Sequence, residues 1–391
     1  MNMPVASWPS FSDEEATAVK NVILSNKVNY WTGSECREFE KEFAAWTGSE
    51  YAIALSNGTL ALDVALIALG VQAGDEVIVT PRTFLASASA IVNAGATPVF
   101  ADVDRESQNI TAETIRAVMT PRTKAIICVH LAGLPCDMDP IMTLAEAHDI
   151  FVIEDCAQAH GARYKGRMVG SIGHIGAWSF CQDKIMTTGG EGGMVTTNSR
   201  KLWSAMWSYK DHGKSWEAVY ERSHPPGHRW VHESFGTNAR MLETQAVIGR
   251  IQLQRMALWT AQRRVNAARI AAVCREYAVV RVPVVPANVE HAFYKFYVFV
   301  EPDKLANGWT RDRIANEIAV QGVPCAPGSC SEVYLEKAFD NTGFRPERRL
   351  KVAQELGETS LMFLVHPTLT DADIERTCQV IGDVLSIAEK K

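Results

Sequence analysis

The 391-residue sequence has no long apolar run, and none approaches the roughly 20 residues that a membrane-spanning helix needs. A secretory signal is also missing, because Met1 to Glu15 contains no basic segment followed by an apolar core. We therefore predict a cytoplasmic protein with no membrane partner.

An excess of positive charge is absent as well. The chain has 39 Lys and Arg against 45 Asp and Glu, a formal net charge of -6. Such a balance provides no broad basic surface for nucleic acid, so we expect no nucleic-acid partner. An anionic substrate would need a local basic pocket.

Paired cysteines and a dinucleotide fingerprint are lacking too. The nine cysteines are odd in number and no two are spaced CxxC, which argues against a disulfide framework and a zinc site, so no metal is predicted. No G-x-G-x-x-G stands between a first strand and a helix, since Gly189 to Gly193 leads into the strand-like run Met194 to Thr197. A nicotinamide oxidoreductase is therefore disfavoured.

Short β-branched runs alternate with helical patterns over the first half of the chain. The hydrophobic share of 47% is enough for a large core. Continuous apolar strands between helices are typical of a mostly parallel sheet covered on both faces. The predicted strands are 76–80, 97–100, 125–129 and 150–153, and the predicted helices are 84–93, 112–119 and 139–148.

The pattern changes after about residue 190. A polar stretch runs from Trp203 to Phe235, and a long helix is predicted from Met241 toward Val273. The tail mixes a strand signal at 292–300 with helical ones at 310–320 and 371–387. We predict a large α/β domain at 1–255 and a smaller α+β domain at 256–391.

Two signals lie early in the predicted sheet. The polar loop Ser56-Asn57-Gly58-Thr59 opens an apolar helix, where free backbone N–H groups favour a phosphate, although an ordinary N-cap has the same composition. Phe84 follows the strand at 76–80 and can stack on a flat ligand, or simply fill the core.

Two further signals carry ionisable groups. Asp155 ends the apolar strand at 150–153, where a buried carboxylate needs a partner such as a protonated pyridine nitrogen; an N-cap or a metal ligand are the alternatives. Lys184 stands between a strand and the turn Gly189 to Gly193, among aromatic and small residues. A lysine there can form a Schiff base, whereas most lysines are solvated surface charges.

The order of these signals resembles the DegT/DnrJ/StrS family of sugar aminotransferases, which have the fold-type-I aspartate-aminotransferase architecture with a seven-stranded type of sheet. The resemblance covers nearly the whole chain. Its most specific segments are SNGTLAL at 56–62, PRTFLASASAI at 81–91, EDCAQAHGA at 154–162, Lys184 with TTGGEGG, and FGTNARMLETQAVIG at 235–249.

The resemblance implies pyridoxal 5'-phosphate as cofactor, passing through its pyridoxamine form, and a role for each matching residue. Lys184 carries the cofactor and moves protons, and Asp155 pairs with the ring nitrogen. The other expected cofactor contacts are Gly58, Thr59 and Ser179 at the phosphate, Phe84 and Gln158 at the ring, and Asn238. Asn238, with Arg240 nearby, matches a segment that reaches the neighbouring subunit's site, which implies a homodimer.

The implied reaction moves an amino group from glutamate to a nucleotide-linked keto sugar, which we expect to be a UDP-linked 4-keto-6-deoxy sugar with a 2-acetamido group. Candidate substrate contacts are Lys27, Tyr30, Trp31, Arg240 and Lys214.

Several alternatives to this reaction remain. Amination at C-3, or amination of a dTDP- or GDP-sugar, stays open. A same-fold sugar dehydratase is disfavoured because those relatives have histidine at the position of Lys184. A cofactor-binding regulator is disfavoured because no basic recognition helix is present. The stretch from Asp211 to Glu233 either forms a substrate loop, or its four histidines are simply exposed to solvent.

Overall fold

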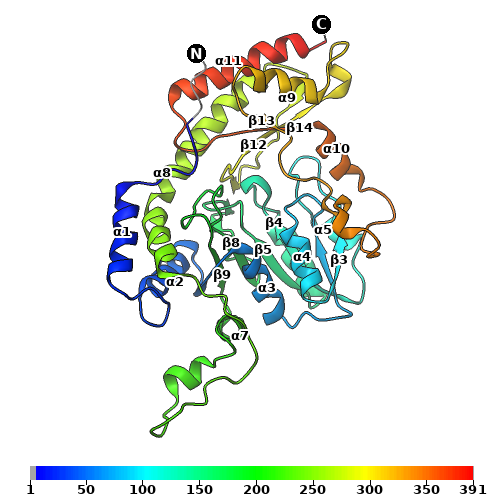
Figure 1. Ribbon diagram of the computed structural model, residues 1–391. Helices are drawn as coiled ribbons and strands as arrows, with labels where there is room; N and C mark the ends of the chain where they lie inside the picture. The colour runs from blue at the N-terminus through cyan, green and yellow to red at the C-terminus, as the bar shows by residue number, and fades with distance from the viewer. Residues whose placement is uncertain (1–5, 391) are drawn as a thin grey trace.

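A seven-stranded sheet forms the centre of the computed structural model, which describes residues 6–390 (Figure 1). Its strand order is β1-β9-β8-β5-β4-β2-β3. The five strands from β8 to β3 are mutually parallel, while β9 is antiparallel to both of its neighbours. The strands are β1 (Tyr51–Leu55), β2 (Glu76–Val79), β3 (Thr97–Phe100), β4 (Thr123–Val129), β5 (Phe151–Asp155), β8 (Ile175–Ser179) and β9 (Gly193–Thr197). The mostly parallel sheet is confirmed.

Alternate residues of the strands pack against helices on opposite faces, as the two-residue period of a strand requires. Val79 and Ile127 share a core with α3, α4 and α7, whereas Ile126 and Val152 share another with α5 and α6. A third core packs α2 and α8 against the β8-β9-β1 end. The helices are α2 (Glu35–Thr47), α3 (Gly58–Ala68), α4 (Ala86–Asn93), α5 (Ala112–Arg116), α6 (Met138–Ala147) and α7 (Arg200–Lys210).

The long helix predicted near Met241 is α8 (Glu243–Cys274), which connects the central sheet to the C-terminal part (Figure 1). Its first half packs against α1 (Asp13–Leu24), where buried Glu15 accepts a hydrogen bond from Gln252. The proposed boundary at 255/256 falls inside this helix, and the division into two domains stays a prediction. Within residues 6–390, no helix combines the length and the apolarity that crossing a bilayer requires.

The C-terminal part has its own core, built on a four-stranded antiparallel sheet of order β10-β12-β14-β13. Helices α9 and α11 and the second half of α8 contribute to this core. Its elements are β10 (Val280–Arg281), β12 (Phe296–Val300), β13 (Cys325–Ala326), β14 (Ser360–Phe363), α9 (Arg311–Val320), α10 (Lys351–Thr359) and α11 (Asp371–Ala388). The small elements are β6 (Arg163–Tyr164), β7 (Arg167–Met168), β11 (Val289–Glu290), η1 (Leu131–Gly133), η3 (Pro302–Lys304), η4 (Val333–Leu335) and η5 (Lys337–Phe339).

The stretch 203–235 is only partly polar loop. Its start belongs to α7, where Trp207 is 1% exposed and packs against Trp216, so this part of the stretch is helical and contributes to the core. The remainder, residues 211–235, is called the arm; it contains the short helix η2 (Glu217–Glu221) and extends away from the sheet (Figure 1). Three of its histidines are exposed, while His224 is partly buried against the carbonyl of Ala218.

Candidate active site

One cavity of about 550 Å³ brings together the residues singled out at the carboxyl ends of the strands. β5 and β8 are parallel. β1 runs in the same direction as β8, because β1 and β8 each pair antiparallel with β9. Their carboxyl ends therefore share one edge of the sheet, where open α/β sheets bind ligands. The cavity is lined by Gly58, Thr59, Phe84, Asp155, Gln158, Ser179 and Lys184.

The loop before α3 is shaped as an anion site. Asn57 caps the helix by accepting a hydrogen bond from the N–H of Leu60 at 2.9 Å. Gly58 is the first helical residue and Thr59 is exposed toward the cavity. A Cβ on Gly58 would lie 2.5 Å from the Cβ of Ser179. This close approach sets the hydroxyls of Thr59 and Ser179 around the helix N-terminus, which favours a phosphate.

Gly58→Ala should weaken cofactor binding by about tenfold, because the new methyl group displaces either Ser179 or the start of α3. The dissociation constant is measured by equilibrium dialysis of the cofactor. Gly382→Ala is the matched control: its Cβ meets only ordinary contacts at 3.4 Å or more inside α11, so cofactor affinity should not change. Equal effects of both substitutions would contradict the role given to Gly58.

Asp155 is buried at the end of β5, with 6% of its surface exposed. Its Oδ2 accepts a hydrogen bond from Ser87 Oγ at 2.8 Å, and its Oδ1 accepts one from the N–H of Ala157 at 3.1 Å. Burial raises the pKa of the Asp155 carboxyl, and these hydrogen bonds and the charge of Lys184 oppose that rise. Within residues 6–390 the carboxylate has no cationic hydrogen-bond partner, so it suits a cationic group placed in the cavity.

Gln158 has one end of its amide fixed. Its Oε1 accepts a hydrogen bond from the N–H of Ala132 at 2.7 Å, which leaves the Nε2 hydrogens as donors toward the cavity. Phe84, by contrast, is 71% exposed and lines the cavity rather than the core. The core alternative for Phe84 is therefore wrong, and a stacking role stays a prediction.

Lys184 follows β8 by five residues and is held through its backbone. Its N–H donates to the carbonyl of Cys181 at 3.0 Å, and its carbonyl accepts from Trp8 Nε1 at 2.8 Å. The side chain is half-buried, and its Nζ lies 5.2 Å from the centre of the Tyr294 ring. The amine is therefore presented to the cavity from a fixed loop.

The glycine turn after Lys184 packs closely against the loop before α3. A Cβ on Gly193 would lie 2.3 Å from the carbonyl oxygen of Asn57. Glycine at this position therefore lets the two loops approach each other.

A second cavity of about 590 Å³ adjoins the first and shares five residues with it, including Lys184 and Gln158. Its other wall comes from the C-terminal part and consists of Tyr294, Lys295, Tyr297, Gly328, Ser329, Cys330, Val333, Glu336 and Met362. Lys184 therefore lies where the two cavities meet, so a group held in the first can react with a molecule in the second.

Behind the site, Glu154 and His130 form a buried network that resembles a metal site in composition only. Glu154 accepts hydrogen bonds from His130 Nε2 at 3.0 Å and from three backbone N–H groups of the turn 170–173. His130 Nδ1 accepts from the N–H of Cys136 at 3.0 Å. Burial would raise the pKa of Glu154, but these bonds hold it below its ordinary value. The carboxylate and both ring nitrogens are thus engaged, and the network supports β5.

The candidate substrate residues lie outside both cavities of their own chain. Tyr30 is 1% exposed and donates to Glu40, so it offers no face to a sugar, and that prediction is wrong. Trp31 is covered by Lys214, whose Nζ lies 4.0 Å above its ring. The others are placed as follows: Lys27 is exposed at a separate hollow, Asn238 is exposed, and Arg240 and Lys214 both pair with Asp211.

Three residues of the site were not identified from the sequence. Ser87, which holds Asp155, lies inside the segment 81–91 and was detectable there. Tyr294, which donates to Asp183, and Lys295 carry no local motif and reach the site only through the packing of the C-terminal part.

Comparison with known proteins identifies the chain's relatives. Residues 9–382 match the profile of the DegT/DnrJ/EryC1/StrS aminotransferase family. A GDP-perosamine synthase of Caulobacter vibrioides is 38% identical and covers 94% of this chain and 95% of its own. A UDP-N-acetyl-3-dehydro-alpha-D-glucosamine 3-aminotransferase of Acidithiobacillus ferrooxidans is 35% identical over 97% of this chain and 96% of its own.

A crystal structure of an aminotransferase from Psychrobacter cryohalolentis superposes with a TM-score of 0.96 at 66% identity, covering 98% of this chain and 99% of that one. The fold-type-I architecture is thereby confirmed. The chain belongs to the DegT/DnrJ/EryC1/StrS aminotransferase family and is an aminotransferase of sugar nucleotides that depends on pyridoxal phosphate.

Proposed function

We propose that this enzyme transfers the amino group of glutamate to C-4 of a UDP-linked 4-keto-6-deoxy-2-acetamido hexose, in the cytoplasm, for a surface polysaccharide or glycan. The observation that carries the proposal is the convergence of Lys184 and Asp155 on a cavity that opens into a second of about 590 Å³. That second space suits a large acceptor. A relative named for a UDP-N-acetyl sugar supports the nucleotide, and its 3-amino product makes C-3 the alternative carbon.

The residues lining the first cavity fit the cofactor. The N-terminus of α3 with Gly58, Thr59 and Ser179 would hold the phosphate. Asp155 would pair with the ring nitrogen, and the Nε2 of Gln158 would donate to the ring hydroxyl. When bound, pyridoxal phosphate supplies an electron sink for the carbon that exchanges its amino group.

Lys184 is the residue placed to act on the reacting carbon. Its amine would attach the cofactor and then accept and return the proton at that carbon. Phe84 would cover one ring face and exclude water from it. Asp183 is held by Tyr294 and keeps a negative charge beside Lys184; burial would raise the Asp183 pKa, but Lys184 and Tyr294 hold it below its ordinary value.

We also infer a homodimer in which the arm and the segment after it reach the neighbouring site. Phe235 is fully exposed and Trp230 is 81% exposed, although both are large and apolar. Apolar rings gathered on a projecting segment are typical of an interface. Lys27, Trp31, Asn238 and Arg240 lie outside the two cavities that meet at Lys184 of their own chain, and a shared site would give them a function.

Hybrid dimers test the shared site. Lys184→Ala and Asn238→Ala chains should each be inactive or impaired alone, yet mixing them should restore about a quarter of wild-type activity, because half of the dimers would carry one intact site. Turnover is measured after subunit exchange. A fully active monomer by light scattering, or mixed activity no greater than the two parents give, would refute the arrangement.

The substrate is tested with a panel of UDP-, dTDP- and GDP-linked 4-keto-6-deoxy sugars, each supplied with glutamate. We expect the UDP-linked 2-acetamido sugar to be converted with the highest kcat/KM, and proton spectra of the product to show the amino group at C-4. Preference for another nucleotide, or amination at C-3, would overturn that part of the proposal while leaving the aminotransferase activity intact.

A further inference from the structure

Lys295 is a cation of the second cavity that the proposed chemistry has not used. Among the residues that line the two cavities, only Lys184 and Lys295 are cationic. The Nζ of Lys295 lies 4.8 Å from the centre of the Tyr294 ring, and that of Lys184 lies 5.2 Å from the same centre. The two amines are therefore at most about 10 Å apart.

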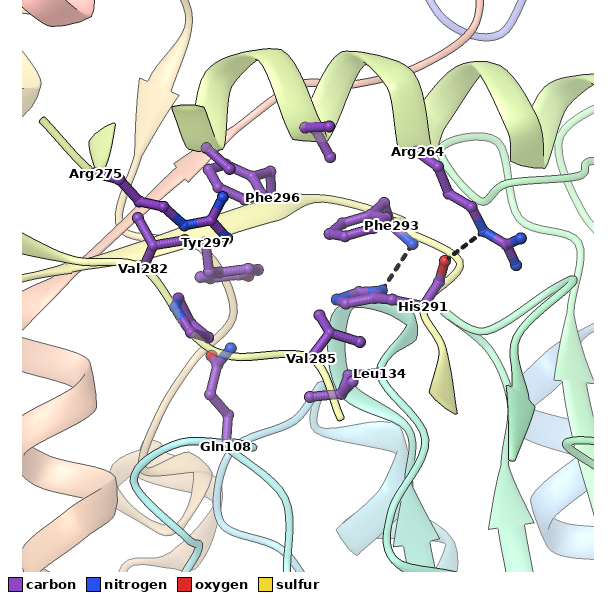
Figure 2. Close-up of a pocket in the computed structure, with 14 residues that line it drawn as sticks. Gln108, Leu134, Arg264, Arg275, Val282, Val285, His291, Phe293, Phe296 and Tyr297 are labelled. Atoms are coloured by element: carbon purple, nitrogen blue, oxygen red, sulfur yellow. Dashed lines mark hydrogen bonds between the residues drawn. The ribbon is translucent and has the colours of Figure 1, made fainter. Parts of the chain in front are cut away.

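The backbone that leads to Lys295 is braced from α8. Arg263 Nη1 donates to the carbonyls of Phe293 and Tyr294 at 3.4 and 3.3 Å. Figure 2 shows the neighbouring bonds at a smaller hollow behind Tyr297: Arg264 Nε donates to the carbonyl of His291, and the N–H of Phe293 donates to His291 Nδ1. β12 begins directly after Lys295, at Phe296. The amine thus projects from a fixed segment.

Charges of both signs surround Lys295, because Asp183 and Glu336 line the same cavity as Lys184 and Lys295 and Arg263 lies behind it. Arg263 is 1% exposed, and its Nε and Nη2 have no hydrogen-bond partner among residues 6–390. Burial lowers the pKa of Arg263 to about 9. Burial, with the charges of Arg263 and Lys184, lowers the pKa of Lys295 to about 8, although Asp183 opposes this shift. Within the same range of the chain, the Lys295 amine makes no ion pair within 4 Å. Lys295 is itself only partly buried, and a cation that is held partly out of water without an ion pair favours a bound anion.

The position beside Lys184 decides which anion is expected. The cofactor phosphate is assigned to the opposite region, at Gly58 and Ser179. An amino-acid donor carries its α-carboxylate on the same carbon as the amino group that reacts at Lys184. The diphosphate of a nucleotide sugar is attached at C-1, across the ring from a keto group at C-4. The donor carboxylate is therefore the anion that must lie near the reacting amine.

We propose that Lys295 binds the α-carboxylate of the amino-acid donor, and so determines which donors the enzyme accepts. This inference rests on the proposed function in two respects, namely that an α-amino acid is the donor and that the keto group is at C-4. The sugar acceptor occupies the same cavity in the other half of the reaction without needing this charge.

The two half-reactions of the holoenzyme separate donor from acceptor. Glutamate lowers the visible absorbance of the cofactor, and this fall is measured at increasing glutamate concentrations. In Lys295→Met, the glutamate concentration that gives half of the maximal effect should rise by about 30-fold or more. The rate at which a UDP-linked keto sugar restores that absorbance to the pyridoxamine form should change by less than about 3-fold. Lys295→Arg should recover most of the donor affinity, and Lys337→Met, an exposed lysine of η5, should behave as wild type.

Binding and stability give readouts that do not depend on turnover. Calorimetric titration with 2-methylglutamate, which has no proton to lose at the reacting carbon, should show the same 30-fold weakening in Lys295→Met, or about 2 kcal/mol. A lysine whose folded pKa is lowered destabilises the fold below that pKa, so at pH 7 Lys295→Met without ligand should melt at the wild-type temperature or above it.

Each other outcome overturns the assignment. Loss of the sugar half-reaction with normal glutamate binding would assign Lys295 to the nucleotide sugar. Equal losses in both halves, with a lowered melting temperature, would make the residue structural. No change in either half would show that Lys295 binds neither substrate. If the wild-type enzyme reacts with glutamate but with no keto sugar, the proposed acceptor is wrong while the donor experiment still tests Lys295.

Discussion

Lys184→Ala should lower turnover by at least about 10⁴-fold, because one side chain would lose both the attachment of the cofactor and the transfer of the proton. The fold should be retained. The loop is held through the backbone of Lys184, by Cys181 and Trp8, and the amine itself faces the ring of Tyr294. We expect the free energy of unfolding to change by no more than about 1 kcal/mol.

Borohydride reduction locates the attachment directly. Wild-type enzyme treated with borohydride should carry a pyridoxyl group on the peptide that contains Lys184, and Lys184→Ala should carry none. Lys41→Ala, an exposed lysine on α2, is the control and should be labelled at Lys184 as in wild type. A label on any other lysine of the wild-type enzyme would refute the assignment.

Asp155→Asn should slow turnover by roughly 100-fold, which corresponds to about 3 kcal/mol in the barrier. A neutral amide cannot hold a proton on the ring nitrogen by charge, and its NH₂ group would also face a donor, either Ser87 Oγ or the N–H of Ala157. Ser87→Ala removes only one bond to the carboxylate, and we expect a loss of about tenfold or less. Single-turnover rates with glutamate measure both.

The stability of cofactor-free Asp155→Asn separates this role from a structural one. The folded pKa of Asp155 is raised, so the buried carboxyl makes the empty site less stable at pH values above the ordinary pKa of an aspartate, neutral pH included. The cofactor-free variant should therefore melt no lower than wild type. Asp63→Asn is the control, because burial also raises the pKa of Asp63 but that residue lines neither cavity. Normal turnover in Asp155→Asn would mean that the carboxylate has another role.

Much of the fold was predictable because its signals are local. The apolar runs at 76–80 and 150–153 form β2 and β5, and the pattern from Met241 forms α8. The meeting of Gly58, Asp155 and Lys184 followed from one topological rule, that carboxyl ends of parallel strands share an edge.

The errors arose where tertiary packing decides exposure. Tyr30 was predicted to contact the substrate, yet its side chain is buried under Lys210, whose Nζ lies 3.6 Å above the Tyr30 ring. The tryptophans of 203–216 lie in a polar sequence, and only the folded chain packs Trp203 and Trp207 edge to face against Trp216. Lys295 is 111 residues from Lys184, and no local pattern could indicate that both reach one cavity.

Transfer of ¹⁵N tests the central claim most directly. Enzyme given [¹⁵N]glutamate and the UDP-linked keto sugar should yield, by mass spectrometry, an amino sugar that contains ¹⁵N, together with unlabelled 2-oxoglutarate. Lys184→Ala should yield neither product. A sugar product that has lost a hydroxyl group and contains no ¹⁵N, or consumption of glutamate without any change in the sugar, would contradict the account.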